Sequence, residues 1–121
     1  MGEDLTPQLI AEDAEHGDHL LAGLIMEMAR YLGATITTAV HVIDPALVLL
    51  GGAMTFGRND TAVGREFLRR VHREFRSRTF ATLANKISID YASLGGDAGF
   101  IGAAGCARRT VDPGRVSPWT D

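Results

Sequence analysis

The chain has 121 residues, of which 45% are hydrophobic and 22% are charged, and its formal net charge is −3. This length supports at most one domain with a modest core, and the composition is that of a soluble globular protein rather than a disordered one. The small negative charge argues against nucleic acid as an obligate partner. A single cysteine excludes an intrachain disulfide and a cysteine-based zinc site. We expect no membrane segment and a cytoplasmic location, because the sequence has neither a signal-peptide pattern nor an apolar run of about 18 residues.

The first half of the chain predicts two helices. Thr6-Pro7 is a helix start, and the first helix should run to about Glu15 and end at Gly17. Asp18 should cap a longer helix that ends before Asp44-Pro45, because proline disfavours a helical residue before it. The steps of three and four between apolar residues predict one continuous buried stripe on this second helix. The stripe consists of Leu20, Leu21, Leu24, Ile25, Met28, Tyr31, Leu32, Ile36, Ala39, Val40 and Ile43.

The second half alternates strands with helices. Leu47–Leu50 is a continuous aliphatic run, which is typical of a strand that is buried on both faces. Helical periodicity returns over Ala62–Arg78, a second strand follows over Lys86–Tyr91, and a last helix over Gly99–Arg109. The order helix, helix, strand, helix, strand, helix predicts an α/β fold with a short parallel sheet and a right-handed crossover.

This sheet is too small to stand alone, because two strands make a poor independent unit. The Leu47–Leu50 run is also too apolar for the few predicted helices to cover it. We therefore expect additional strands from outside the chain, supplied by a missing N-terminal lobe or by a second copy in a homo-oligomer.

Two segments, Ile43–Ala53 and Leu94–Ala104, carry glycines at the carboxyl end of a short apolar run, and we call them the glycine joints. Open α/β sheets bind ligands at the carboxyl ends of their strands, where these joints lie. Gly51-Gly52 allows a sharp turn, and exposed backbone N–H groups in such a turn suit phosphate oxygens. The alternative for this pair is a simple strand-to-loop turn. The alternative for the second joint is pure packing, with Asp97 as a helix cap and the small residues after it as a close-contact face.

Together the two joints resemble the C-terminal signature of the ROK family of sugar kinases and repressors. The first carries a helix end followed by an apolar run and Gly51-Gly52, and the second reads Leu-Gly-Gly-Asp-Ala-Gly-Phe-Ile-Gly-Ala-Ala. The resemblance covers roughly Leu5 to Arg109, which corresponds to about the last third of a typical family member. It implies that residues 1–110 are a segment of a ribonuclease H-like, actin-like ATPase lobe. Residues 111–121 contain two prolines and a glycine and are expected to form a flexible tail.

The resemblance also implies a role in nucleotide binding. In the family, the loop that corresponds to Gly51, Gly52 and Ala53 lies near the adenosine and phosphates of ATP, which acts with Mg²⁺. The family often has a third glycine where Ala53 stands. The segment is therefore expected to be the nucleotide side of a glucokinase-like kinase that transfers phosphate from ATP to a hexose. The alternative is the C-terminal part of a sugar-responsive ROK repressor.

The family's other functional motifs lie upstream of the matched segment. These are the phosphate loop, the catalytic aspartate, the sugar-contacting Glu and His, and the cysteine-rich zinc motif, and none has a counterpart here. We assign no catalytic or metal-binding residue and expect no tight nucleotide binding and no kinase activity from the chain alone.

Other residues that could carry chemistry have simpler interpretations. His16 and His19 are separated by helix-breaking residues, and no third ligand follows at metal spacing. The arginines of Arg65–Arg78 could meet phosphates or nucleic acid, but a charged helix is usually a solvated face, and nucleic acid is not expected for this segment. Its basic charge could pair with the acidic N-terminal helices of the same chain or of a neighbouring copy. Cys106 is expected to be a buried filler rather than a nucleophile.

Overall fold

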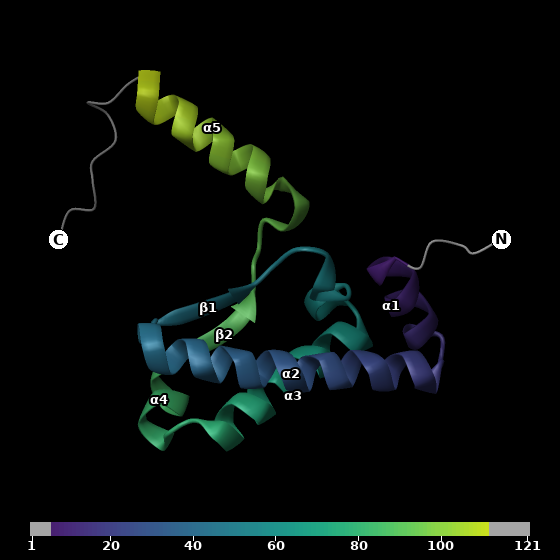
Figure 1. The fold of residues 1–121 in the computed structure, drawn as a ribbon. Helices are drawn as coiled ribbons and strands as arrows, with labels where there is room; N and C mark the ends of the chain where they lie inside the picture. The colour runs from purple at the N-terminus through teal and green to yellow at the C-terminus, as the bar shows by residue number, and fades with distance from the viewer. Residues whose placement is uncertain (1–5, 112–121) are drawn as a thin grey trace.

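A computed structural model describes residues 6–111, in which helices pack on one face of a two-stranded sheet (Figure 1). The helices are α1 (Pro7–Glu15), α2 (His19–Ile43), α3 (Ala62–Arg78), α4 (Ala81–Lys86) and α5 (Ala98–Val111), and the strands are β1 (Leu47–Leu50) and β2 (Ser88–Tyr91). Short 3-10 turns η1 (Ala53–Thr55), η2 (Arg58–Asp60) and η3 (Gly95–Asp97) complete the order.

The predicted helix ends are confirmed by their caps. The hydroxyl of Thr6 accepts a hydrogen bond from the Leu9 backbone N–H at 3.3 Å, and Asp18 accepts from the first turn of α2 at 2.9 and 3.1 Å. Such caps satisfy N–H groups that have no partner within the helix. At the other end of α2, Asp44 adopts a left-handed conformation directly before the proline, and the helix stops.

Sequence periodicity missed α4. This helix has six residues, which is too short for a periodic pattern to stand out, and it lies where a connecting loop was expected. It ends at Lys86, the first residue of the predicted second strand, and β2 begins two residues later, at Ser88. The last helix begins and ends within two residues of its predicted bounds.

The two strands are parallel, as predicted. Leu47 pairs with Ser88 and Leu50 pairs with Tyr91, so both strands end at the same edge of the sheet. Residues at alternate positions point to opposite faces of the sheet. Leu50, Ile89 and Tyr91 are buried and belong to the core, whereas Ser88 and Asp90 are exposed.

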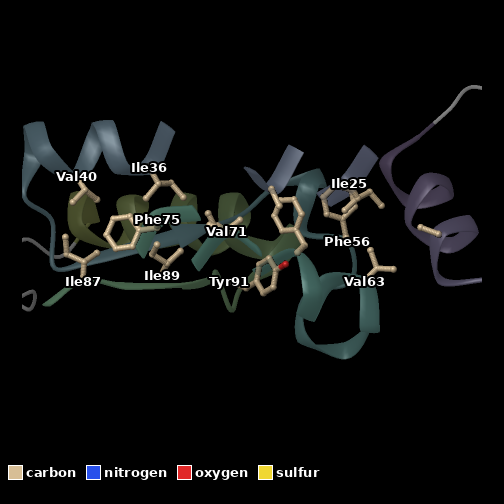
Figure 2. Packing of buried hydrophobic residues seen from close by; sticks show 14 residues of the cluster. Ile25, Ile36, Val40, Phe56, Val63, Val71, Phe75, Ile87, Ile89 and Tyr91 are labelled. Atoms are coloured by element: carbon tan, nitrogen blue, oxygen red, sulfur yellow. The ribbon is translucent and has the colours of Figure 1, made fainter. Parts of the chain in front are cut away.

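The core lies between the long helices and this face of the sheet. Figure 2 shows the side chains of α2, α3 and the strands converging in one cluster, which includes Ile25, Ile36, Val71, Phe75 and Ile89. Among the described elements, α2 and α3 make the most extensive contact, and they lie side by side (Figure 1).

Gly33 permits the close approach of these helices. A Cβ at this position would lie 2.7 Å from the Cβ of Glu74 and 2.9 Å from the carbonyl oxygen of Val71. Both separations are shorter than side chains tolerate, so the packing of α2 on α3 requires glycine at this point.

The predicted apolar stripe of α2 is only partly buried. The residues that face the core include Ile25, Ala29, Ile36 and Val40. Leu20 and Tyr31, which were predicted to belong to the buried stripe, are 81% and 60% exposed. Leu24, Ala39 and Ile43 are exposed as well. The helix is apolar over more of its circumference than the described chain covers.

The strand β1 is buried on one face rather than on both. Leu47 and Leu49 are 50% and 56% exposed, because no described helix packs on their side of the sheet. In Figure 1, α5 projects away from the rest of the fold, and all of its residues are exposed. The expectation that these elements cannot cover the first strand is confirmed.

By length and mean hydropathy, α2 also satisfies the criteria for a helix that could cross a membrane, which the sequence analysis did not anticipate. The core helix of a soluble protein satisfies the same criteria. Here α2 packs along α3 and contributes several buried residues to the core, so we treat it as a core helix.

Candidate functional site

The two glycine joints meet at one edge of the sheet. The strands β1 and β2 are parallel and end together. Gly51-Gly52, which follows β1, therefore lies next to Ala92, which follows β2. The backbone N–H of Ala92 donates to the carbonyl of Leu50 at 2.8 Å and extends the pairing to this edge.

A cleft of about 460 Å³ opens here. It is lined by Gln8 of α1, by both glycine turns and by the loop between β1 and α3. The lining residues are Gln8, Gly51, Gly52, Thr55, Arg58, Ala92, Gly95 and Gly96. The predicted residues Gly51 and Gly52 therefore lie in a cleft with the second joint, and Ala53 follows them as the first residue of η1. Their predicted role in nucleotide binding stays a prediction.

Two of the four glycines in the cleft are explained by their backbone conformation. Gly52 has φ +83° with ψ −159°, and Gly95 has φ +55°. The Gly52 conformation is essentially restricted to glycine, and the Gly95 conformation is strained for most other residues. These two positions make the sharp turns that follow each strand.

The other two glycines are not explained by the described chain. A Cβ on Gly96 would meet no heavy atom within 4 Å, and a Cβ on Gly51 would make an ordinary contact of 3.6 Å with the Cβ of Ala92. Neither position has a positive φ. Glycine here leaves bare backbone on the cleft surface, where a ligand can approach the main chain without a side chain in the way.

Arg58 connects the two sides of the cleft. Its guanidinium Nη1 donates to the carbonyl of Ser93 at 3.1 Å and, more weakly, to that of Ala92 at 3.5 Å. The sequence analysis assigned no role to this arginine, which precedes α3 and lies in the loop after β1. The neighbouring Gly57 marks a turn just before it, but a turn glycine does not indicate which groups the Arg58 side chain contacts.

The amino terminus of α3 is already satisfied by the protein. The carboxylate of Glu15 accepts hydrogen bonds from the N–H groups of Ala62 and Val63, both at 2.9 Å, and these bonds hold the pKa of Glu15 below its ordinary value. The hydroxyl of Thr61 accepts from the N–H of Gly64 at 3.0 Å. This helix end therefore has a protein anion in place and does not offer a phosphate site.

A smaller hollow of about 270 Å³ lies beside the cleft, between α1 and the loop that begins with Phe56. Gln8 borders both spaces, and Glu15 and His16 line the smaller one. The His16 ring nitrogen Nδ1 is 2.6 Å from the carbonyl oxygen of Glu12 and is engaged in a local hydrogen bond.

The other predicted candidates lie away from the cleft. Among residues 6–111, no group of three or more His, Cys, Asp or Glu residues could hold a metal ion. Several arginines of α3 pair with glutamates of the same helix rather than with the acidic N-terminal helices: Arg69 with Glu66, and Arg70 and Arg78 with Glu74. Cys106 is exposed on α5, so the expectation that it is a buried filler is wrong for the described chain.

The model of the ROK family matches residues 1–110. The chain belongs to the ROK family. Among its relatives is a xylose repressor of Caldicellulosiruptor bescii, to which it is 23% identical over 92 residues; the match covers 76% of this chain and 22% of the repressor.

The fold is similar to the crystal structure of a protein assigned as a sugar kinase from Cytophaga hutchinsonii. The TM-score is 0.72 at 25% sequence identity, and the match covers 88% of this ROK chain and 34% of the kinase chain. The chain thus spans about a third or less of the length of these relatives. They include a repressor and a kinase, so family membership does not by itself decide between the two activities.

Proposed function

We propose that this ROK chain is the nucleotide-side segment of an ATP-dependent sugar kinase of glucokinase type, built as part of a ribonuclease H-like, actin-like ATPase lobe. The observation that carries the proposal is the meeting of the two glycine turns, more than 40 residues apart, in one cleft at the carboxyl edge of a parallel sheet. Ligands bind at this edge in open α/β sheets.

The residues of the cleft suit a nucleotide. Gly51 and Gly96 present bare backbone to the cleft. Thr55 adds a hydroxyl group, and Arg58 adds a permanent positive charge. ATP with Mg²⁺ would supply the phosphoryl group that the kinase transfers. Ala53 belongs to the proposed nucleotide loop together with Gly51 and Gly52.

The residues described here bind and orient but do not transfer protons in this proposal. Asp90 is exposed on the sheet, and its carboxylate accepts the N–H of Tyr91 at 2.7 Å. In the family, the base that activates the sugar hydroxyl and the phosphate loop lie upstream of the matched segment. Phosphoryl transfer needs both, so we expect the chain alone to hold nucleotide weakly and to have no kinase activity.

Nuclear magnetic resonance of the isotope-labelled chain tests this proposal. Titration with Mg-ATP should shift the amide signals of Gly51, Gly52, Gly95 and Gly96 in a saturable manner. Gly96→Val should remove this response without loss of stability, because its side chain would project from a position with free space around it. Gly99→Val, on the exposed helix α5, is the matched control and should respond like the wild type. Unchanged signals in the wild type would contradict the proposal.

The alternative is the C-terminal part of a sugar-responsive ROK repressor, which the similarity to the xylose repressor supports. A sugar-sensing body needs no ATP, so the same titration separates the two functions. Saturable binding of Mg-ATP in the cleft favours the kinase. Its absence, together with a DNA-binding domain in the protein that carries this segment, favours the repressor.

A further part of this proposal is that the protein is cytoplasmic and that other strands complete its sheet. The uncovered apolar surface supports the second point. Leu47 and Leu49 present the open face of the sheet, and Phe100 of α5 is 76% exposed. Either a second copy or an N-terminal lobe would bury this surface, and apolar burial is the main driving force for such association.

A further inference from the structure

Arg58 makes the one side-chain connection between the loop after β1 and the second glycine turn among the hydrogen bonds of residues 6–111. Nη1 reaches the carbonyls of Ala92 and Ser93, which lie 34 and 35 residues further along the chain. The guanidinium also lies beside the second turn, since a Cβ on Gly95 would be 3.7 Å from Nη1 and 4.0 Å from Nη2.

The backbone around Arg58 is held in an unusual conformation. Phe56, Gly57 and Arg58 have φ values of +46°, +79° and +56°, so three successive residues are left-handed. Left-handed backbone costs a non-glycine residue about 1–2 kcal/mol, and it persists where the surrounding structure enforces it. Arg58 therefore occupies its position at a cost in backbone energy.

Two contacts hold the loop that contains Phe56 and Arg58 against the start of α3. The carbonyl of Phe56 accepts from the hydroxyl of Thr61 at 2.6 Å, and the carbonyl of Arg58 packs against Gly64, where a Cβ would lie 1.9 Å from its oxygen. Because this backbone is held, the guanidinium is presented to the cleft from a fixed base rather than from a mobile loop.

Arg58 is also the one ionisable residue among those that line the cleft in the described part of the chain. Arginine remains protonated at any physiological pH and offers five N–H groups in a planar fork. The two carbonyl contacts use Nη1, which leaves the N–H groups of Nε and Nη2 for another acceptor. Charge-assisted bonds from a guanidinium to phosphate are among the strongest in proteins.

We propose that Arg58 is the positioning residue of this cleft, and that it binds the phosphates of a nucleotide. Through the carbonyls of Ala92 and Ser93 it sets the separation of the two glycine turns. Through its remaining N–H groups it holds a phosphate oxygen. The phosphate contact rests on the proposed nucleotide function, whereas the positioning role does not.

Arg58→Gly removes the side chain and leaves the backbone conformation in place, so it tests the contribution of the side chain alone. Glycine accepts a φ of +56° without strain, so this variant should fold with a thermal midpoint close to that of the wild type. Arg58→Lys keeps the charge but replaces the planar fork by a point charge. Arg65→Lys is the matched control, because the Arg65 guanidinium also bonds a backbone carbonyl of this loop, that of Asn59 at 2.9 Å, yet Arg65 does not line the cleft.

The positioning role is measured without nucleotide. The amide signals of Gly95 and Gly96 should move in Arg58→Gly and Arg58→Lys and stay in place in Arg65→Lys. Unmoved signals in Arg58→Gly would overturn the positioning role, whatever the chain binds.

The phosphate contact is measured by the affinities for Mg-ATP and adenosine. Affinity for Mg-ATP should fall about tenfold or more in Arg58→Gly, and affinity for adenosine should fall much less. Equal losses for the two ligands would overturn the phosphate contact and leave a purely positional role. If wild-type chain binds neither ligand, the proposed nucleotide function and the phosphate contact both fail, while the nucleotide-free signals still decide the positioning role.

Discussion

Replacement of Gly64 by alanine tests how the loop that carries Arg58 is seated on α3. A Cβ at Gly64 would lie 1.9 Å from the carbonyl oxygen of Arg58 and 2.8 Å from that of Phe56. These are backbone atoms, so the loop or the helix must move as a whole. The carbonyl of Gly64 also accepts the hydroxyl of Tyr91 at 2.8 Å, and this bond would be disturbed as well.

The size of the effect follows from two opposing contributions. Alanine gains about 1 kcal/mol over glycine in a helix interior. Overpacking of a well-packed site costs typically about 1–3 kcal/mol, and a contact of 1.9 Å with backbone places Gly64→Ala at or above the upper end. We expect the free energy of unfolding to fall by about 2 kcal/mol, which lowers the thermal midpoint by roughly 10 °C in a domain of this size.

Gly23→Ala in α2 is the control. It is the same substitution in a helix, but a Cβ there would meet no atom within 4 Å. It should raise the free energy of unfolding by about 0.5–1 kcal/mol through helix propensity alone. Circular dichroism during thermal and urea unfolding measures both variants. If Gly64→Ala stabilises the chain as Gly23→Ala does, the loop is not packed on α3 as described, and the fixed base argued for Arg58 is lost.

Other predictions follow from the same packing and from two titratable groups. Gly33→Ala should lower the thermal midpoint, because its Cβ would press on the Glu74 side chain and the Val71 carbonyl; an unchanged midpoint would show that the helices can separate at little cost. The pKa of Glu15 is lowered in the folded chain, chiefly by the bonds from Val63 and Ala62, so its contribution to stability is present above its ordinary pKa of 4.5 and is lost as the pH falls below it. Glu15→Gln should therefore destabilise at pH 7, the difference from wild type should shrink in acid, and a difference that is independent of pH would refute the capping role. Burial raises the pKa of Tyr91 from 10.0 to about 12, so its stabilising effect is present below pH 10 and should fade as the pH rises toward 12. Tyr91→Phe should cost about 1 kcal/mol at pH 7 in urea unfolding and remove this alkaline component. Analytical ultracentrifugation should show self-association that Leu49→Lys weakens, and a stable monomer of 13.0 kDa would show that the open sheet face needs no cover from a second copy.

Local signals in the sequence determined most of the elements. The caps at Thr6 and Asp18 and the proline after Asp44 fixed the helix ends, because each acts on backbone groups within a few residues. The apolar residues before each glycine turn indicated both strands, and the helix between them indicated parallel pairing, although the short helix α4 left no periodic signal.

Burial could not be predicted in this way, because it depends on which other elements pack against a given face. The sequence shows that Leu47–Leu50 and α2 are apolar, but only the tertiary structure shows which faces are covered and that Leu49 and Tyr31 are not. A pattern of hydrophobic residues reflects the surroundings in a complete fold, and this chain matches 34% of the structure to which it is similar.

The candidate site divides in the same way. Gly51 and Gly52 were identifiable because a glycine pair after an apolar strand is a local pattern, and the resemblance to the ROK family rests on it. Arg58 could not be identified from the sequence, because its role arises from a left-handed backbone and from two carbonyls more than 30 residues away. Such a connection is decided by how the loop is packed on Gly64 and by the register of the strands, and neither is written in the residues next to Arg58.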